Sequence, residues 1–271
     1  QALTGFEGAG EAAIYLHPQG PMHGGDVDLI IREMNWWGPY PDVANEIIRS
    51  VARPGFLRGN WMGYTKDPNG LLRRYWEMVT NNMNMVMWWK WDNVGNWHGL
   101  LKPDLGLYPE IKALINDTQV VRDGLGTLLR HCEIQDDRVA MLYAFASTYM
   151  AHLDGNPTYG DNSGKKSFFA KEQNAWNAQI HRAGLQAAYV TDRMLRLGEF
   201  CGPRYKVLIL PLALTIGQKE ADVIRAFVHN GGTLIADVRP GIYTGHGRPR
   251  DGGILDDVFG IRRTGRSDAI A

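Results

Sequence analysis

The first half of the chain alternates short apolar runs, typical of buried strands, with amphipathic stretches at helical spacing. Four apolar runs predict strands at residues 2–7, 27–32, 55–64 and 83–91. Amphipathic stripes predict helices at residues 42–51, 71–82 and 108–129. Such alternation predicts an α/β fold with a parallel sheet and right-handed crossovers. Four strand–helix units are half of a (β/α)8 barrel, so we predict a partial barrel here.

The second half predicts another parallel sheet. Its apolar runs predict strands at residues 138–145, 187–191, 205–210 and 233–238. Helices are expected at residues 172–183, 192–200, 218–229 and 251–259. This is the pattern of a doubly wound, flavodoxin-like domain. A short polar junction at 131–136 separates the two predicted domains, 1–131 and 137–271.

Residues 83–98 carry the sharpest change along the chain, from an apolar run to a polar, aromatic loop. The change falls at Lys90, Asp92 and Asn93, close to three tryptophans. Active sites of α/β barrels are built at the carboxyl ends of their strands. The pattern therefore favours a functional edge at the end of this strand, although a core strand followed by an ordinary loop would have the same pattern.

Three carboxylates follow apolar runs, namely Glu7, Glu33 and Asp92. Neighbouring strands lie about 4.8 Å apart, so Glu7 and Glu33 are expected to approach one another at one edge. Paired carboxylates hydrolyse glycosidic bonds, and their separation determines whether the anomeric configuration is retained or inverted. Proximity also separates their pKa values, which makes one an acid and the other a base. The alternative is structural ion pairing, for example of Glu33 with Arg32 or Arg58.

Tryptophans are concentrated in the first half: of nine, eight lie between Trp36 and Trp97. Flat indole rings suit stacking on sugar faces, and amide or imidazole neighbours suit hydrogen bonds to hydroxyls. The predicted sugar-binding residues share positions near expected strand ends: Trp91, Trp89, Trp61, Trp36, Asn35, Asn60 and His98. The alternative is that these rings fill a barrel core. Side chains alternate along a strand, which favours Trp91 over Trp88 as a ligand contact.

Composition and net charge exclude some classes of binding partner. Hydrophobic residues make up 44% and charged residues 21%, and 29 basic residues balance 29 acidic ones. We therefore expect a globular protein without nucleic acid or an anionic membrane as main partner. Cys132 and Cys201 lack the spacing of zinc or redox motifs, and no nucleotide-binding or metalloprotease motif occurs, so we expect no metal and no cofactor. We expect a soluble protein. The sequence assigns it no cellular compartment, since any signal peptide would lie upstream of Gln1.

The order of these parts is specific. The strand MVMWWKWD is followed by the loop GNWHGLLKPDLGLYPE, and later by YKVLILPLALTIGQKEADVIRAFVHNGGTLIADVRPG. This arrangement resembles the family 42 β-galactosidases and their relatives. The resemblance implies strands five to eight of a TIM barrel, then a trimerisation domain with a glutamine-amidotransferase-like fold. It also implies a piece of a longer protein, a carbohydrate substrate with a β-linked sugar, and a homotrimer.

The resemblance fails at the catalytic residues. The family's nucleophilic Glu ends strand seven, but residues 55–64 contain no carboxylate, and Arg58 or Gly59 stands near that place. The family's acid/base Glu would lie upstream of Gln1. Three explanations are open. Glu33, Glu7 or Asp92 carries out catalysis, catalysis has been lost, or the alignment with the family is shifted by one strand.

Two functions follow, with a third disfavoured. The first is part of a glycoside hydrolase, with Glu33 as the leading carboxylate. The second is a non-catalytic carbohydrate-binding or oligomerisation module. An amidotransferase-type domain is disfavoured because residues 211–217, which follow a strand where that fold carries its cysteine, contain none.

Overall fold

A computed structural model describes residues 5–7, 26–38, 43–63, 65–91, 99–153 and 168–263 of the chain. These residues form two compact units, one with residues 5–7 and 31–135 and one with residues 26–30 and 136–263. Within the described residues, no helix is long and apolar enough to cross a membrane.

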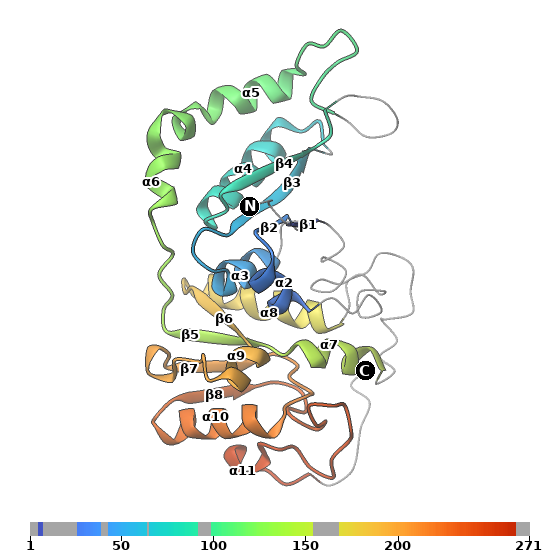
Figure 1. Ribbon diagram of the computed structural model, residues 1–271, viewed down its shortest axis with the longest axis vertical. Coiled ribbons are helices and arrows are strands. Elements are labelled where there is room, and N and C mark those ends of the chain that lie inside the picture. The colour runs from blue at the N-terminus through green and yellow to red at the C-terminus, as the bar shows by residue number, and fades with distance from the viewer. Residues whose placement is uncertain are drawn as a thin grey trace. The chain divides into compact units, whose positions relative to one another are not determined.

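The first unit contains a parallel sheet with strand order β1-β2-β3-β4 (Figure 1). Its strands are β1 (Gly5–Glu7), β2 (Trp36–Gly38), β3 (Leu57–Gly63) and β4 (Met85–Trp89). Its helices are α3 (Val43–Val51), α4 (Pro68–Thr80), α5 (Pro109–Asp117) and α6 (Gly126–Arg130). The predicted parallel α/β alternation is confirmed, with four described strands in chain order.

Local sequence explains where these helices begin and end. The Asp67 carboxylate caps α4 by accepting hydrogen bonds from the amides of Asn69 (3.1 Å) and Gly70 (3.0 Å), and Pro68 occupies its first turn. The predicted helix over 108–129 is divided instead. A π-helical turn, Val121–Leu125, follows α5, and Gly124 within it has φ of 140°. A side chain at that φ would be strained, so the break depends on glycine.

The strand predicted over residues 27–32 is wrong, because Val27–Glu33 forms helix α2. Its first turn is held by polar contacts: the Asp26 carboxylate accepts from the amide of Leu29 at 3.0 Å, and Asp28 accepts from the hydroxyl of Thr191. Arg193 forms an ion pair with Asp26, and both residues belong to the second unit. An acidic first turn also complements the helix dipole. The second strand of the sheet is instead Trp36–Gly38.

The second unit contains a parallel sheet of order β6-β5-β7-β8. Its strands are β5 (Val139–Tyr143), β6 (Ala187–Thr191), β7 (Val207–Leu210) and β8 (Thr233–Ala236). Its helices are α7 (Phe145–Leu153), α8 (Phe168–Arg182), α9 (Asp192–Leu197), α10 (Gln218–His229) and α11 (Asp256–Phe259), with a 3-10 turn at Gly202–Arg204. The four predicted strands are confirmed, whereas α7 was not predicted.

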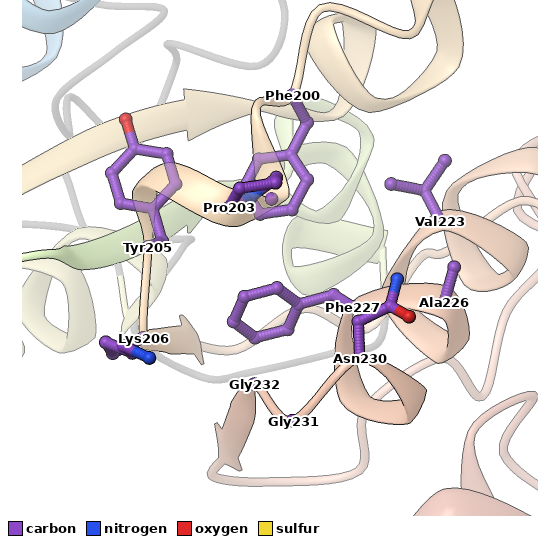
Figure 2. A pocket seen from close by; sticks show the side chains of 11 residues that line it. Phe200, Pro203, Tyr205, Lys206, Val223, Ala226, Phe227, Asn230, Gly231 and Gly232 are labelled. Atoms are coloured by element: carbon purple, nitrogen blue, oxygen red, sulfur yellow. The ribbon is translucent and has the colours of Figure 1, made fainter.

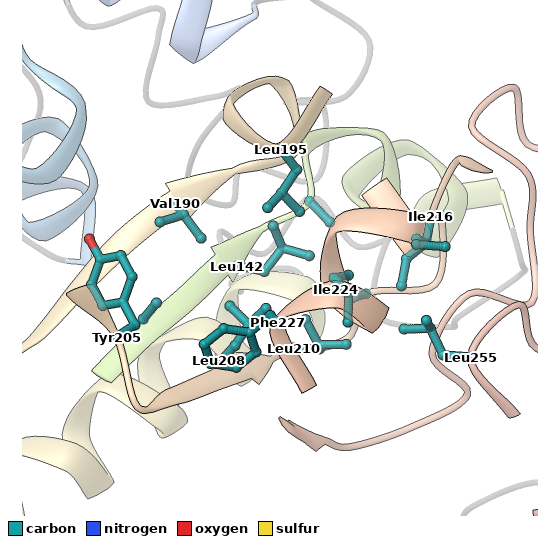
Figure 3. Close-up of a cluster of buried hydrophobic side chains, with 14 of the residues drawn as sticks. Leu142, Val190, Leu195, Tyr205, Leu208, Leu210, Ile216, Ile224, Phe227 and Leu255 are labelled. Carbon is teal, nitrogen blue, oxygen red and sulfur yellow. The ribbon is translucent and has the colours of Figure 1, made fainter. Parts of the chain in front are cut away.

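One large hydrophobic core holds the second unit together (Figure 3). Leu142, Val190 and Leu210 of the sheet pack in the same cluster as Leu195 of α9 and Ile224 of α10. All five side chains are at most 1% exposed. Burial of one such side chain contributes about 1.5–3 kcal/mol, so this cluster is the main source of stability in the unit.

Candidate functional site

Alternation along β3 and β4 separates two faces of the first sheet. Met62, Val86 and Trp88 belong to the hydrophobic cluster that includes Leu71 and Met78 of α4. Trp61, Met87 and Trp89 alternate with these residues and therefore lie on the opposite face. We call this opposite side the tryptophan face, defined by Trp36, Gly38, Trp61, Met87 and Trp89. Trp88 packs against this cluster and so lies on the other face from Trp89, as the alternation along the strand predicted.

Aromatic side chains form a wall at the carboxyl end of β4. The rings of Trp61 and Trp89 meet edge to face, with centroids 5.9 Å apart and planes at 78°. Trp89 is 40% exposed and Trp91 is 70% exposed. The carbonyls of Lys90 and Trp91 accept hydrogen bonds from the amides of Leu100 (2.9 Å) and Leu101 (3.1 Å). The Trp89–Lys90 peptide bond is cis. Trp89 and Trp91 are thus exposed, and the amides of Leu100 and Leu101 hold the backbone that follows Trp89.

Three glycines leave positions on the tryptophan face without side chains, namely Gly38, Gly59 and Gly63. A Cβ on Gly38 would lie 1.6 Å from the Met87 methyl carbon, so the Met87 side chain occupies the space over that glycine. A Cβ on Gly59 would lie 1.9 Å from the Met85 carbonyl oxygen, and one on Gly63 would lie 2.3 Å from that of Trp89. At Gly59 and Gly63 the neighbouring backbone leaves no room for a side chain. Trp61 and Trp89 therefore project beyond their strand neighbours.

Strand register places three predicted residues at the wrong end of the sheet. Trp36 begins β2 and pairs with Leu57, the first residue of β3. Trp61 lies four residues further along β3, a rise of about 13 Å at about 3.3 Å per residue. Asn35 and Glu33 precede Trp36, with Glu33 at the end of α2. The predicted position of all three at the carboxyl edge is wrong, because it rested on the incorrect strand at 27–32.

Glu7 keeps the backbone position that the sequence predicts. It is the last residue of β1 and pairs with Gly38 of β2. Two strand spacings, about 10 Å, separate β1 from β3. Strands β2, β3 and β4 contain no carboxylate in their described residues. Asp92 and His98 lie outside the described residues. Among the three candidate carboxylates, Glu7 is therefore the one that the described residues place at the end of a strand.

Asn60 faces away from the tryptophan face, contrary to the prediction. Its side chain is fully buried, and its amide exchanges two hydrogen bonds with that of Asn45 on α3, at 2.9 and 2.8 Å. This pair fastens α3 to β3 through buried groups. Its role is structural, and its signal in the sequence, a polar residue in a strand, does not distinguish the two faces.

Replacing Asn60 with Ala should lower the free energy of unfolding by about 1–3 kcal/mol, because Asn45 would keep a buried amide without its partner. Urea denaturation of the chain would measure this loss. Adding Asn45→Ala should then cost little more, whereas Asn69→Ala on the exposed first turn of α4 should cost almost nothing. Strictly additive losses at Asn60 and Asn45 would contradict the pairing.

The end of β7 is where an amidotransferase-like fold would carry its cysteine. Leu212 lies here with φ of 42° and is 2% exposed. Its amide donates to the Asp237 carboxylate at 2.7 Å, and the Trp176 indole donates to the same group at 3.0 Å. Burial raises the pKa of Asp237, and burial and the charge of Asp237 raise the pKa of Glu172. Cys201 and Cys132 lie elsewhere and are exposed, so this position has no thiol nucleophile.

Comparison with known proteins found no matching family model and no matching curated protein. Solved structures do match, and the following three are family 42 or other β-galactosidases. The enzyme from Bacillus circulans sp. alkalophilus has a TM-score of 0.68 at 16% identity, over 86% of this chain and 37% of its own. Gan42B, a GH42 β-galactosidase from G. stearothermophilus, has 0.67 at 14%, over 85% and 37%. The enzyme from Halorubrum lacusprofundi has 0.65 at 14%, over 86% and 39%.

These matches show a fold shared with β-galactosidases. They extend over most of this chain, yet the chain spans less than two fifths of each of these relatives.

Proposed function

We propose that this chain is part of a glycoside hydrolase related to the family 42 β-galactosidases, and that the tryptophan face binds a β-linked sugar. The observation that carries the proposal is the edge-to-face pair of Trp61 and Trp89 at the carboxyl end of a parallel sheet, with the exposed Trp91 two residues after Trp89. In this proposal β1 to β4 are strands five to eight of a barrel. The second unit is a flavodoxin-like, trimerisation-type domain, and the assembly is a homotrimer.

The wall and the acid–base chemistry come from different parts of the site. Trp89 and Trp91 offer flat apolar surface to the C–H face of a sugar ring, with Trp61 bracing Trp89 edge-on. Glu7 is the leading carboxylate, and Asp92 and His98 remain candidates for catalysis and for hydroxyl binding. Glu33 loses the strand-end position on which its proposed role rested.

A second candidate function has a specific observation in its favour. The family's nucleophile is expected at the end of strand seven, which in this proposal is β3. Strand β3 ends at Gly63, and the neighbouring Trp89 carbonyl leaves no room for a side chain there. A carboxylate cannot be restored at this position without moving β4. A non-catalytic carbohydrate-binding module derived from a hydrolase would have this feature.

Replacing Trp91 with Ala should weaken the binding of lactose about 5–30-fold, since one aromatic stacking contact contributes about 1–2 kcal/mol. Trp89→Ala should have a similar effect. Titration calorimetry on the full-length gene product would measure the affinity, and release of p-nitrophenol from an aryl β-galactoside would measure hydrolysis. Trp76→Ala, on α4 and outside the wall, is the matched control and should bind as the wild type does.

The combined results separate the two functions. Binding that depends on Trp91, together with hydrolysis, supports the hydrolase. Binding that depends on Trp91 without hydrolysis supports the module. Sugar binding that survives both wall substitutions, or no sugar binding at all, would overturn the proposed site.

A further inference from the structure

One exposed leucine in the first unit has a backbone conformation that leucine rarely adopts. Leu105 has φ of 63°, and its side chain is 76% exposed. Its amide donates to the Lys102 carbonyl at 2.9 Å, and the Lys102 amide donates to the Gly106 carbonyl at 2.8 Å. These bonds define a hairpin turn whose last loop residue is left-handed, a position that glycine or asparagine normally fills. Gly106 comes one residue too late to fill it.

The hairpin that contains this turn is anchored on both sides. Leu101 and Leu107 form an antiparallel bridge, and the Asp104 carboxylate accepts from the amide of Gly106 at 2.9 Å. Leu107 also packs against the hydrophobic cluster that α4 and α5 share. These contacts hold Leu105 in its left-handed conformation. That conformation costs free energy, which an exposed side chain does not recover by burial, and backbone outliers of this kind gather at functional sites.

The hairpin is joined to the tryptophan wall by its backbone. The amides of Leu100 and Leu101 donate to the carbonyls of Lys90 (2.9 Å) and Trp91 (3.1 Å). Residues 100 and 101 thus run beside residues 90 and 91 in the same direction, and the turn begins at the next residue. Leu105 therefore lies just beyond Trp91 at the carboxyl edge of the first sheet. Trp91 is itself 70% exposed, so this edge presents apolar surface from both segments.

We propose that Leu105 contacts the leaving group of a β-glycoside whose sugar stacks on the tryptophan wall, and that this leaving group is an apolar aryl or alkyl group. The inference rests on the proposed function, because the sugar must first occupy the wall. A leucine side chain offers C–H surface and no hydrogen bond, so it favours ligand atoms that lose no hydrogen bonds to water. A second sugar at this place would bring hydroxyls that need polar partners.

The test compares phenyl and methyl 1-thio-β-D-galactopyranoside, which share the sugar and resist hydrolysis. Titration calorimetry on the full-length gene product measures both affinities. The wild type is expected to bind the phenyl ligand about fivefold or more tightly than the methyl ligand, because the ring buries additional apolar area. Leu105→Ala should weaken binding of the phenyl ligand about threefold or more and leave the methyl ligand unchanged.

Leu105→Asn tests the strain at this position separately from the contact. Asparagine tolerates the left-handed conformation, so this variant should melt about 2–4 °C above the wild type. It should lose the phenyl preference as Leu105→Ala does. Leu105→Ala keeps a residue that disfavours this φ and should gain none of the stability. A variant that is more stable and binds less tightly would show that the leucine serves binding and not folding.

Other apolar surfaces of the chain provide the controls. Leu128 on α6 is 60% exposed, and Leu128→Asn should change neither affinity. The second unit has a hollow of about 500 Å³, lined in part by Phe200, Ala226 and Phe227, which is large enough for a phenyl ring (Figure 2). Ala226→Leu adds bulk to this hollow from an exposed helix position and should leave the phenyl preference unchanged.

The outcomes separate this contact from the proposed sugar site. If neither thiogalactoside binds, sugar binding at the wall fails and the contact fails with it. If both bind equally, if the phenyl preference survives Leu105→Ala, or if Ala226→Leu removes it, the contact is overturned while the sugar site stands. A Leu105→Asn variant less stable than the wild type would contradict the strain. A smaller assembly for Leu105→Ala in light scattering would assign the leucine to a subunit interface instead.

Discussion

Replacing Glu7 with Gln is expected to lower kcat of the full-length gene product about 10²–10⁴-fold, the range of one general acid or base. The reason is position: Glu7 ends a strand at the carboxyl edge of the first sheet, beside Gly38 of β2. The amide keeps the size of the carboxyl group but can neither accept a proton nor form a glycosyl ester. Initial rates with an aryl β-galactoside would measure the loss.

Glu33→Gln is the matched control for this prediction. Glu33 ends helix α2 before β2 begins, at the other end of the strand, so kcat should stay within about twofold of the wild type. A large loss at Glu33 with none at Glu7 would contradict the assignment. If both variants keep full activity, Asp92→Asn is the next substitution, since Asp92 follows the tryptophan wall in the chain.

Replacing Gly59 with Ala should destabilise the first unit by about 3 kcal/mol or more, the upper range for an overpacked site. The added Cβ would lie 1.9 Å from the carbonyl oxygen and 2.5 Å from the carbonyl carbon of Met85. Both atoms belong to the backbone of β4, so no rotamer change relieves the clash and the two strands must separate. Chemical denaturation followed by circular dichroism would measure the loss.

Gly245→Ala controls for the general effect of adding a methyl group. A Cβ at Gly245 would have no neighbour nearer than 3.6 Å, so this variant should keep the stability of the wild type. Equal stability of Gly59→Ala and the wild type would show that β3 and β4 do not approach as closely as described. The proposed wall of Trp61 and Trp89 depends on that approach.

The first sheet carries aromatic side chains at its carboxyl end, but three of its strands carry no carboxylate in their described residues. Trp61 on β3 and Trp89 on β4 form an edge-to-face ring pair. The described parts of β2, β3 and β4 contain no carboxylate. At the end of β7, the buried Leu212 donates its amide to the Asp237 carboxylate, and both described cysteines lie elsewhere.

The sequence by itself determined the alternation of strands and helices and most of their positions. Helix α10 has the predicted bounds, 218–229, because its apolar stripe is long and glycines follow it. Alternation in β4 correctly separated Trp88 from Trp89, since that pattern is local to the backbone. The missing carboxylate in 55–64 was also evident from the residues alone.

The tertiary structure alone decided where several candidate residues lie. A six-residue apolar run is compatible with a strand or a helix, and contacts of Asp26 and Asp28 with residues more than 160 positions away accompany the helix in α2. Because residues 27–33 form a helix and β2 begins at Trp36, Glu33, Asn35 and Trp36 lie at the amino end of β2. The face on which Asn60 lies likewise depends on its partner Asn45 in a helix packed against the strand. Periodicity is a property of neighbouring residues, whereas the end and the face of a sheet are set by contacts between distant ones.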